Sequence, residues 1–165
     1  CQGVTYVPVG LFDALAGRED AVIIEDGQVN IQTDSAQIPN PFSDCASLKE
    51  LSETAGFFCS FPQSISGYDA PDFRAIPGDL AEAVYSRTDD TLCIRKGAGT
   101  EDISGDYQSY EENSSASVNG LSVTFRGSQG KIHLALWTNN GYAYSIRSDM
   151  GLSNADMTAL VKAVG

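Results

Sequence analysis

Apolar and polar residues alternate strictly along three consecutive segments near the end of the chain. The segments cover residues 121–126, 131–137 and 142–147, and each places an apolar side chain at every second position. Period-two alternation is typical of a strand with one buried and one solvated face. Three such strands in succession predict an antiparallel meander, around which the rest of the chain is organised.

The hydrophobic spacing changes to three or four residues after Gly151, which predicts a C-terminal helix. Ser153 is a suitable N-cap, and Asp156 stands at the third helical position. The apolar side chains on one side of this helix are Met157, Leu160, Val161 and Val164. We expect this amphipathic helix to pack on the apolar face of the meander.

A second, shorter helix is predicted over residues 48–55. Ser47 and Glu50 form a capping box at its start. Gly56 suits the left-handed position that follows the last helical turn. A strand is expected directly afterwards, over residues 57–61.

Residues 63–78 are expected to be mostly loop with a short extended piece over residues 73–76, and the other strands predicted before the meander cover residues 80–85 and 91–96. The last two read as the arms of a hairpin. Alternation then turns Leu92 and Ile94 toward the core. It turns Cys93 and Arg95 toward the opposite face.

A separate hairpin is predicted near the N-terminus. Asp26-Gly27 suits a two-residue turn, and the resulting register pairs Ile24 with Val29 and Val22 with Ile31. The prolines that follow favour an extended linker.

These elements predict an α+β fold in which an antiparallel sheet carries the C-terminal helix on one face and the short helix nearby. The expected organisation is an N-terminal arm with a hairpin over residues 1–37 and a single α+β domain over residues 38–165.

Charge changes the picture of possible partners. The chain carries a net charge of −12, which argues against nucleic acid as a partner and against electrostatic binding to an anionic membrane. Residues 117–165 hold four cations against two carboxylates, a net +2, which leaves −14 for residues 1–116. The acidic part either forms a solvated surface or attracts the basic part within the fold.

The first residues, Cys1-Gln2-Gly3, are similar to the start of a mature bacterial lipoprotein, in which the cysteine thiol carries a diacylglycerol. The alternative is an arbitrary start within a longer chain. No apolar run reaches the roughly 18 residues that a membrane-spanning helix needs. We therefore expect an extracytoplasmic location, with the membrane reached only through a lipid on Cys1.

Four cysteines are present, and none belongs to a C-x-x-C pair, which argues against zinc-ribbon and thioredoxin-like sites. Cys45 and Cys59 flank the short helix. A disulfide between them would stabilise the fold by about 3 kcal/mol through loop closure. The alternative is two buried thiols. Cys93 is expected to be a small packed residue in its strand.

The sequence lacks the usual signatures of catalysis. His133 is the single histidine, which excludes H-E-x-x-H and any two-histidine metal site within the chain. The segment 127–130 does not match the nucleophile elbow, and residues 97–99 lack the third glycine of a dinucleotide loop. We expect no cofactor, and a hydrolase triad would have to recruit His133 from the sheet surface.

A long polar loop is predicted over residues 97–115. Loops of this length in a compact domain are usually functional or mobile. Its carboxylates Glu101, Asp102 and Asp106 could bind Ca²⁺, although the pattern of an EF-hand loop is missing. The alternative is a solvated loop, or one that pairs with arginine and lysine.

The polar face of the meander gathers positive charge. Alternation places five residues of interest on it: Arg126, Lys131, His133, Trp137 and Arg147. Like charges that face each other are destabilising, so something should compensate them. The compensation comes either from the acidic part of the chain or from an anionic small ligand or protein partner, for which an exposed tryptophan would mark an interaction surface.

The assumed turns decide how these side chains face each other. A four-residue turn at 127–130 and a three-residue turn at 139–141 predict four facing pairs: Arg126 with Lys131, Thr124 with His133, Trp137 with Ala143, and His133 with Arg147.

Several short motifs occur along the chain: Asn40-Pro41-Phe42, Ala55-Gly56-Phe57, Ile94-Arg95-Lys96-Gly97, the run 102–107, Leu136-Trp137, Tyr144-Ser145-Ile146 and Gly151-Leu152-Ser153. As a set they resemble uncharacterised bacterial extracytoplasmic or lipoprotein domains of unknown function. The resemblance covers residues 38–165. It implies a sheet with helices and an envelope location, and it implies no reaction and no catalytic residues.

Three functions follow as hypotheses. The first is a non-catalytic, envelope-anchored binding or interaction module. The second is a hydrolase or another enzyme with a site on the polar face of the sheet or at the acidic loop. The third is a carrier of a hydrophobic ligand, which would need a dry cavity between sheet and helix.

Overall fold

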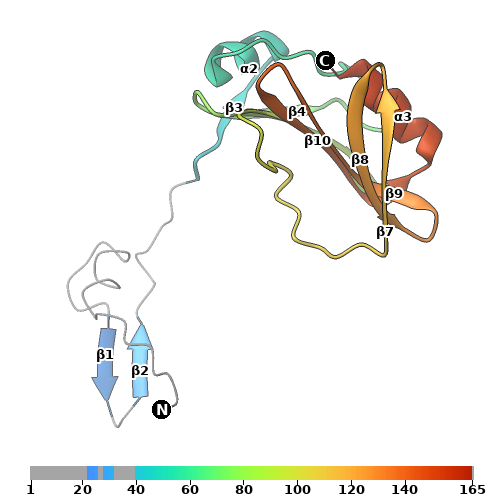
Figure 1. The fold of residues 1–165 in the computed structure, drawn as a ribbon. Coiled ribbons are helices and arrows are strands. Elements are labelled where there is room, and N and C mark those ends of the chain that lie inside the picture. Colours follow the sequence, from blue (N-terminus) through green and yellow to red (C-terminus); the bar gives the residue numbers. More distant parts are fainter. Residues whose placement is uncertain (1–21, 26–27, 32–39, 165) are drawn as a thin grey trace. The chain divides into compact units, whose positions relative to one another are not determined.

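The computed structural model describes residues 22–25, 28–31 and 40–164. The chain divides into two units, residues 1–40 and 41–165. In the first unit, strand β1 (Val22–Glu25) pairs with β2 (Gln28–Ile31), and Ile24 faces Val29 in the predicted register (Figure 1). Cys1 lies outside the described residues.

The second unit is built on one eight-stranded antiparallel sheet with the order β3-β4-β5-β6-β10-β9-β8-β7. The strands are β3 (Ser43–Cys45), β4 (Asp72–Ile76), β5 (Leu80–Arg87), β6 (Asp90–Ala98), β7 (Glu112–Val118), β8 (Leu121–Ser128), β9 (Lys131–Asn139) and β10 (Tyr142–Leu152). The sheet therefore consists of two meanders, β3–β6 and β7–β10, which meet where β6 pairs with β10.

The long polar loop has a topological reason. The chain leaves the middle of the sheet at the end of β6 and enters β7 at its edge, so residues 99–111 must travel across the sheet. We call these residues the crossing segment. The prediction placed residues 112–115 in the loop, but they belong to β7.

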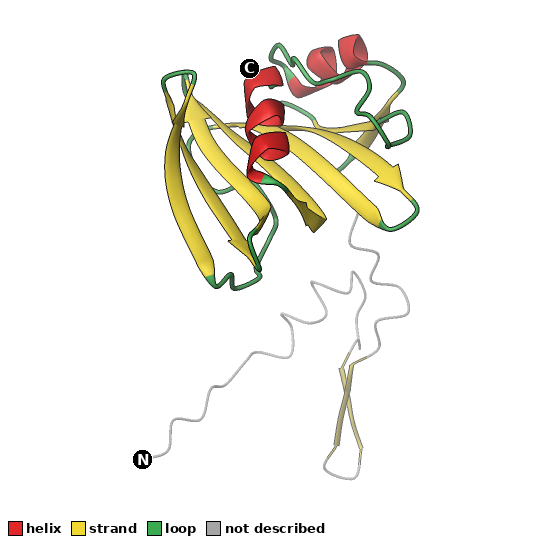
Figure 2. Ribbon diagram, turned by 90° about the vertical axis from the view of Figure 1, so that its right-hand side faces the viewer, coloured by secondary structure: helices red, strands yellow, loops and turns green. Residues whose placement is uncertain are grey.

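Helices α2 (Leu48–Ala55) and α3 (Asn154–Ala163) lie on the same side of the sheet (Figure 2). Both begin as predicted, because Ser47 Oγ accepts a hydrogen bond from Glu50 N and Ser153 Oγ accepts one from Asp156 N. The sheet and the two helices confirm the predicted α+β class. Among the described helices, none has the length and apolarity to cross a membrane.

The core lies between the sheet and the two helices. Leu51 and Ala55 of α2 and Met157 and Val161 of α3 are buried. Sheet residues that complete this core include Tyr85, Leu92, Ile94 and Ile146. We call this side the helix-covered face, and the opposite side the polar face.

The turns of the second meander are shorter than predicted. Gln129-Gly130 and Asn140-Gly141 form two-residue turns, and all four residues have positive φ. This combination is typical of type I′ turns, whose twist matches that of the flanking strands. The predicted four-residue and three-residue turns are therefore wrong, and so are the facing pairs derived from them: Arg126 and Arg147 both face Leu134, Thr124 faces Leu136, and Trp137 faces Tyr144.

A β-bulge in β9 further changes the side-chain pattern. Arg126 pairs with Leu134 and Gly127 with Ile132, which leaves His133 as the extra residue. Gly127 is required there, because a Cβ atom would lie 1.9 Å from the backbone oxygen of Lys131. The bulge explains why strict alternation fails in this strand.

One predicted strand is not formed. Residues 57–61 are irregular and connect α2 to the following loop. Phe61 and Cys59 are nevertheless buried in the core. The apolar run therefore reflects burial rather than a strand.

Candidate functional site

The polar face carries two rows of side chains across the strands. The first row is Asp44, Arg74, Glu82, Arg95, Ser145, Leu136, Thr124 and Ser115. The second row is Asp72, Val84, Cys93, Arg147, Leu134, Arg126 and Asn113. Four arginines from four different strands thus share the one face that neither described helix covers.

Glu82 is the centre of the first row. It is fully buried, and it accepts hydrogen bonds from Arg95 Nε at 2.7 Å and from Arg74 Nε at 2.7 Å. Burial alone would raise the pKa of this carboxyl group, but the bonds from the two arginines outweigh it and lower the pKa. Two guanidinium groups share a single carboxylate, so this trio carries a net positive charge.

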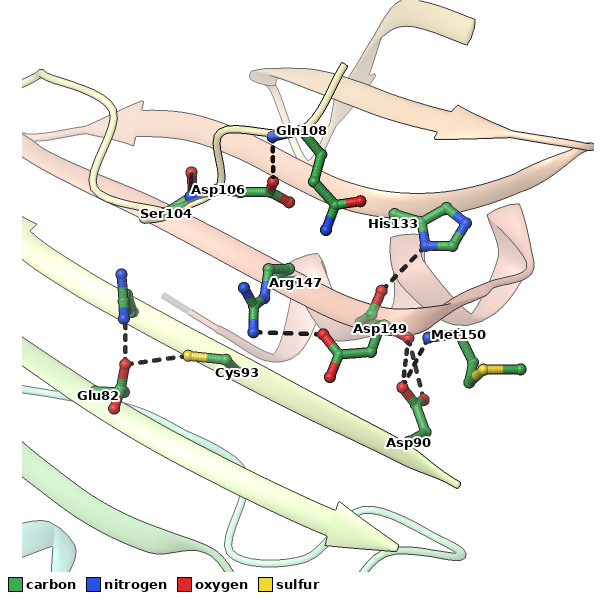
Figure 3. Close-up of polar contacts among 12 residues, drawn as sticks. Glu82, Asp90, Cys93, Ser104, Asp106, Gln108, His133, Arg147, Asp149 and Met150 are labelled. Atoms are coloured by element: carbon green, nitrogen blue, oxygen red, sulfur yellow. Dashed lines mark hydrogen bonds and ion pairs between the residues drawn. The ribbon is translucent and has the colours of Figure 1, made fainter. Parts of the chain in front are cut away.

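Cys93 lies next to this trio and donates a hydrogen bond from Sγ to Glu82 Oε2 at 3.3 Å (Figure 3). Burial, together with the negative charge of Glu82, raises the pKa of the thiol to about 12. Because the thiolate is the nucleophile, this cysteine is unreactive at neutral pH.

The other described cysteines are buried free thiols as well. The Cys45–Cys59 disulfide suggested by the spacing is therefore not formed in this structure. Both residues belong to the hydrophobic core, which agrees with the alternative of two buried thiols.

The crossing segment covers part of the polar face. Asp102 pairs with Arg126 at 3.6 Å, and the carbonyl oxygen of Ile103 accepts a hydrogen bond from Arg95. Gly105 has positive φ, and a Cβ atom there would lie 2.6 Å from the Arg95 guanidinium. The acidic segment therefore compensates part of the positive charge, as one of the two alternatives expected.

His133, the bulge residue, lies under the end of the crossing segment. Its ring stacks on Tyr110 with a centroid distance of 5.7 Å, and Nδ1 lies 3.2 Å from the carbonyl oxygen of Ser148. Tyr110 donates a hydrogen bond to Asp106 at 2.5 Å. Gly151 leaves room for the imidazole ring, because a Cβ atom there would lie 2.8 Å from Nε2.

Arg147 and Lys131 make weaker contacts. Arg147 pairs with Asp149 at 3.3 Å, while its buried Nε has no hydrogen-bond partner among the described residues (Figure 3). Lys131 is exposed, and its Nζ lies 3.5 Å from the carbonyl oxygen of Met150. The predicted cluster of cations is thus spread over the polar face and its margin.

Trp137 does not belong to the polar face. Its side chain is only 4% exposed, and its ring stacks on Tyr144 with a centroid distance of 5.1 Å. The bulge at His133 reverses the alternation, so the tryptophan points into the helix-covered core. The prediction of an exposed tryptophan at a binding surface is therefore wrong.

The three carboxylates of the suggested calcium site have other roles. Asp102 accepts hydrogen bonds from the backbone and side chain of Ser104, and Asp106 accepts one from Gln108 N. Glu101 is exposed. Within the described ranges, no group of three His, Cys, Asp or Glu residues is placed to hold a metal ion.

A groove of about 350 Å³ opens on the polar face beside the crossing segment. One wall is Thr100, Glu101 and Asp102. The floor and the other wall come from β8, β9 and β10 and include Thr124, Arg126, Leu136 and Thr138. Arg126 is 36% exposed, so its guanidinium can contact a ligand in this groove in exchange for Asp102.

A second groove, of about 430 Å³, lies on the other side of the molecule, between α3 and residues 62–68. Its lining includes the apolar side chains of Ile65, Leu92, Leu152 and Leu160. Arg87 and Asp156 add charge to the same lining.

The prediction missed the Glu82 trio. The signal was available, because a hairpin that turns at Thr88-Asp89 pairs Arg87 with Asp90 and therefore Glu82 with Arg95.

The prediction also missed Lys96, which faces the helix-covered side. Lys96 is buried, donates a hydrogen bond to the Phe58 carbonyl oxygen at 2.8 Å and lies 4.4 Å from the Tyr142 ring centroid.

The architecture is that of a two-meander antiparallel sheet with helices on one face and an arginine-bearing polar face on the other. A comparison with known proteins finds no matching family model, no matching curated protein and no matching solved structure.

Proposed function

We propose that the protein is a non-catalytic binding module whose polar face recognises carboxylate groups of a protein partner. The observation that carries this proposal is the groove beside the crossing segment, where the half-exposed Arg126 meets Asp102 at 3.6 Å. A partner carboxylate takes the place of Asp102 on the guanidinium. Arginine is well suited to this exchange because its planar fork binds carboxylates with two hydrogen bonds.

The positive charge of the neighbouring rows supports the proposal. Glu82 alone lies between Arg74 and Arg95, and Arg147 keeps a buried Nε without a described partner. The two rows also contain Asp44 and Asp72, so a partner carboxylate is attracted locally, at the arginines, and not by a net charge of the face. Such attraction acts over about one Debye length and weakens as salt is added.

The state of the possible nucleophiles favours binding over catalysis. The pKa of the Cys93 thiol is raised to about 12, and Nδ1 of His133 lies against the Ser148 carbonyl oxygen while its ring stacks on Tyr110. A general base needs an accessible nitrogen within hydrogen-bond reach of the proton that it removes.

An acidic peptide tests this function. We expect a glutamate hexapeptide to shift the NMR resonances of Thr124, Arg126 and Thr138 in the isotope-labelled protein, and a glutamine hexapeptide to leave them unchanged. Arg126→Gln should weaken the binding about tenfold, as expected for the loss of one charge-assisted hydrogen-bonded pair.

Lys49→Gln is the matched control, because Lys49 is an exposed cation on α2. It should bind the peptide as the wild type does. Equal affinity of the wild type and Arg126→Gln would refute the proposed face.

We also propose that the module is anchored to the bacterial envelope through Cys1. The resemblance of the motifs within residues 38–165 to extracytoplasmic domains supports an envelope location. Mass spectrometry of the protein isolated from its natural source should find acyl groups on Cys1. An unmodified Cys1 that is preceded by further residues would contradict the anchor.

The apolar groove beside α3 favours a second candidate function, the carrier of a hydrophobic ligand. Its volume of about 430 Å³ lies within the range of small-molecule sites. A fluorescent fatty-acid analogue should then bind with enhanced emission, and Leu160→Glu should abolish the enhancement. Absence of any emission change with the wild type would exclude this function.

A further inference from the structure

Strand β7 forms one edge of the sheet and leaves half of its backbone groups unpaired. The two-residue turn at Asn119-Gly120 makes Val118 and Leu121 a hydrogen-bonded pair, so alternate residues along β7 bond to β8. The N–H and C=O groups of Asn113, Ser115 and Ser117 therefore point away from the sheet. No backbone hydrogen bond outside the strand ladders involves these three residues in the described part of the chain.

The two edges of the sheet are not equally protected. At the opposite edge, β3 is only three residues long, which is one way in which proteins blunt an edge. Strand β7 has seven residues, and all except Val118 are exposed. Between 113 and 118 it contains no proline and no charged residue. An edge with these properties is open to the addition of another strand.

We infer that β7 pairs in antiparallel fashion with β7 of a second copy of this chain, about a two-fold axis at Ser115. This register places Ser115 opposite Ser115 of the other copy and Asn113 opposite Ser117, so all outward backbone groups of both strands are bonded. About six hydrogen bonds form, two for each facing pair. An interface of this kind is isologous, because the same surface serves on both copies.

The side chains fit this register. On the polar face the facing side chains are serine and asparagine, which are small and able to hydrogen-bond across strands. On the helix-covered face Ser114 faces Ala116, and Glu112 faces Val118. No like charges are therefore placed directly opposite each other.

The distribution of charge favours β7 of a second copy of this chain as the strand that pairs with the free edge. Residues 113–147 contain three cations and no carboxylate, so β7 after Glu112, β8 and β9 carry no acidic side chain of their own. Two copies with a net charge of −12 each repel least when they meet at this edge. The nearest cation to the edge, Arg126, lies on β8 and lines the groove of the polar face, so an acidic partner reaches it from that face and not as a strand added to β7.

Sedimentation velocity of the full chain over a range of concentrations tests the pairing. We expect a monomer–dimer equilibrium that becomes tighter as salt screens the repulsion between the acidic copies. Ser115→Pro removes the central outward N–H group and leaves the bonds to β8 intact, because proline is tolerated on the open side of an edge strand. It should weaken the dimer about tenfold or more through the loss of two hydrogen bonds.

Ser115→Ala is the matched control, because it changes the side chain and keeps every backbone group. It should dimerise as the wild type does. Ser115→Lys supplies a second test that does not alter the backbone, since it places two ammonium groups opposite each other and should also give a monomer. A wild type that stays monomeric at every concentration overturns the proposal, as does a folded Ser115→Pro or Ser115→Lys variant that associates as tightly as the wild type.

Discussion

The polar face is held together mainly by ion pairs and hydrogen bonds of buried polar side chains. The role of Glu82 is difficult to recognise from the sequence, because its neighbours in the strand are apolar. Its two arginine partners come from β4 on one side and β6 on the other. The pairing of Glu82 with Arg95 could be predicted from the register of the β5–β6 hairpin. The pairing with Arg74 could not, because the sequence locates strand β4 only roughly.

Replacement of Glu82 should destabilise the fold strongly. Glu82→Gln leaves Arg95 partly buried without its carboxylate, and breaking such a buried pair costs about 3–5 kcal/mol. Urea unfolding followed by circular dichroism measures the change.

The control is Glu53→Gln, which breaks an exposed ion pair with Lys49 on the surface of α2. That pair should contribute less than about 1 kcal/mol. Equal losses in the two variants would show that the Glu82 trio does not stabilise the fold.

Cys93 should resist alkylation in the folded protein. Its pKa of about 12 leaves almost no thiolate at pH 8, and its side chain is buried. Iodoacetamide treatment followed by peptide mass mapping should find Cys93 unmodified in native protein and modified in urea. Rapid native labelling of Cys93 would contradict the described packing.

At the scale of elements, the two helices and most strands were predictable, because caps and alternation are local signals. The second meander was predicted with the wrong register. Gln129-Gly130 and Asn140-Gly141 supply the two left-handed residues of a tight turn, and this signal was available in the sequence. The bulge at His133 was not predictable from alternation, and it moved Trp137 from the polar face into the core.

The bulge depends on Gly127. Gly127→Ala brings a Cβ atom against the Lys131 backbone oxygen, so β8 and β9 must move apart. We expect a loss of about 1–3 kcal/mol in unfolding free energy, as for overpacked sites. Ser122→Ala on the exposed part of the same strand should change the stability little. A fully stable Gly127→Ala variant would show that the bulge can rearrange.

At the scale of the whole molecule, two carboxylates, each with several hydrogen-bond partners, connect parts of the domain that are distant in sequence. Glu82 connects β4, β5 and β6. Asp90 accepts hydrogen bonds from Tyr68 at 2.5 Å and from Met150 N at 2.9 Å. Burial alone would raise the pKa of Asp90, but these bonds and one from Ser148 lower it.

These lowered pKa values make stability sensitive to acid. A carboxyl group with a lowered folded-state pKa contributes its stability above the unfolded value, near pH 4, and loses it as the pH falls through the folded value. The melting temperature should therefore fall steeply below about pH 4. Asp90→Asn should be less stable at pH 7 and show a shallower decline, while the exposed Asp72→Asn should keep the wild-type profile. A melting temperature of the wild type that stays constant from pH 5 to pH 2 would contradict this account.

The crossing segment connects two halves of the sheet, and each half is one uninterrupted stretch of the chain. The chain can therefore be cut within the crossing segment without interrupting a strand or helix. Residues 41–98 contain β3–β6 with α2, and residues 112–164 contain β7–β10 with α3. The ladder between β6 and β10 joins the parts through seven facing residue pairs, and α3 and α2 complete one shared core. Two polypeptides cut within the crossing segment should therefore reassemble into one domain, so the protein is suited to use as a split reporter.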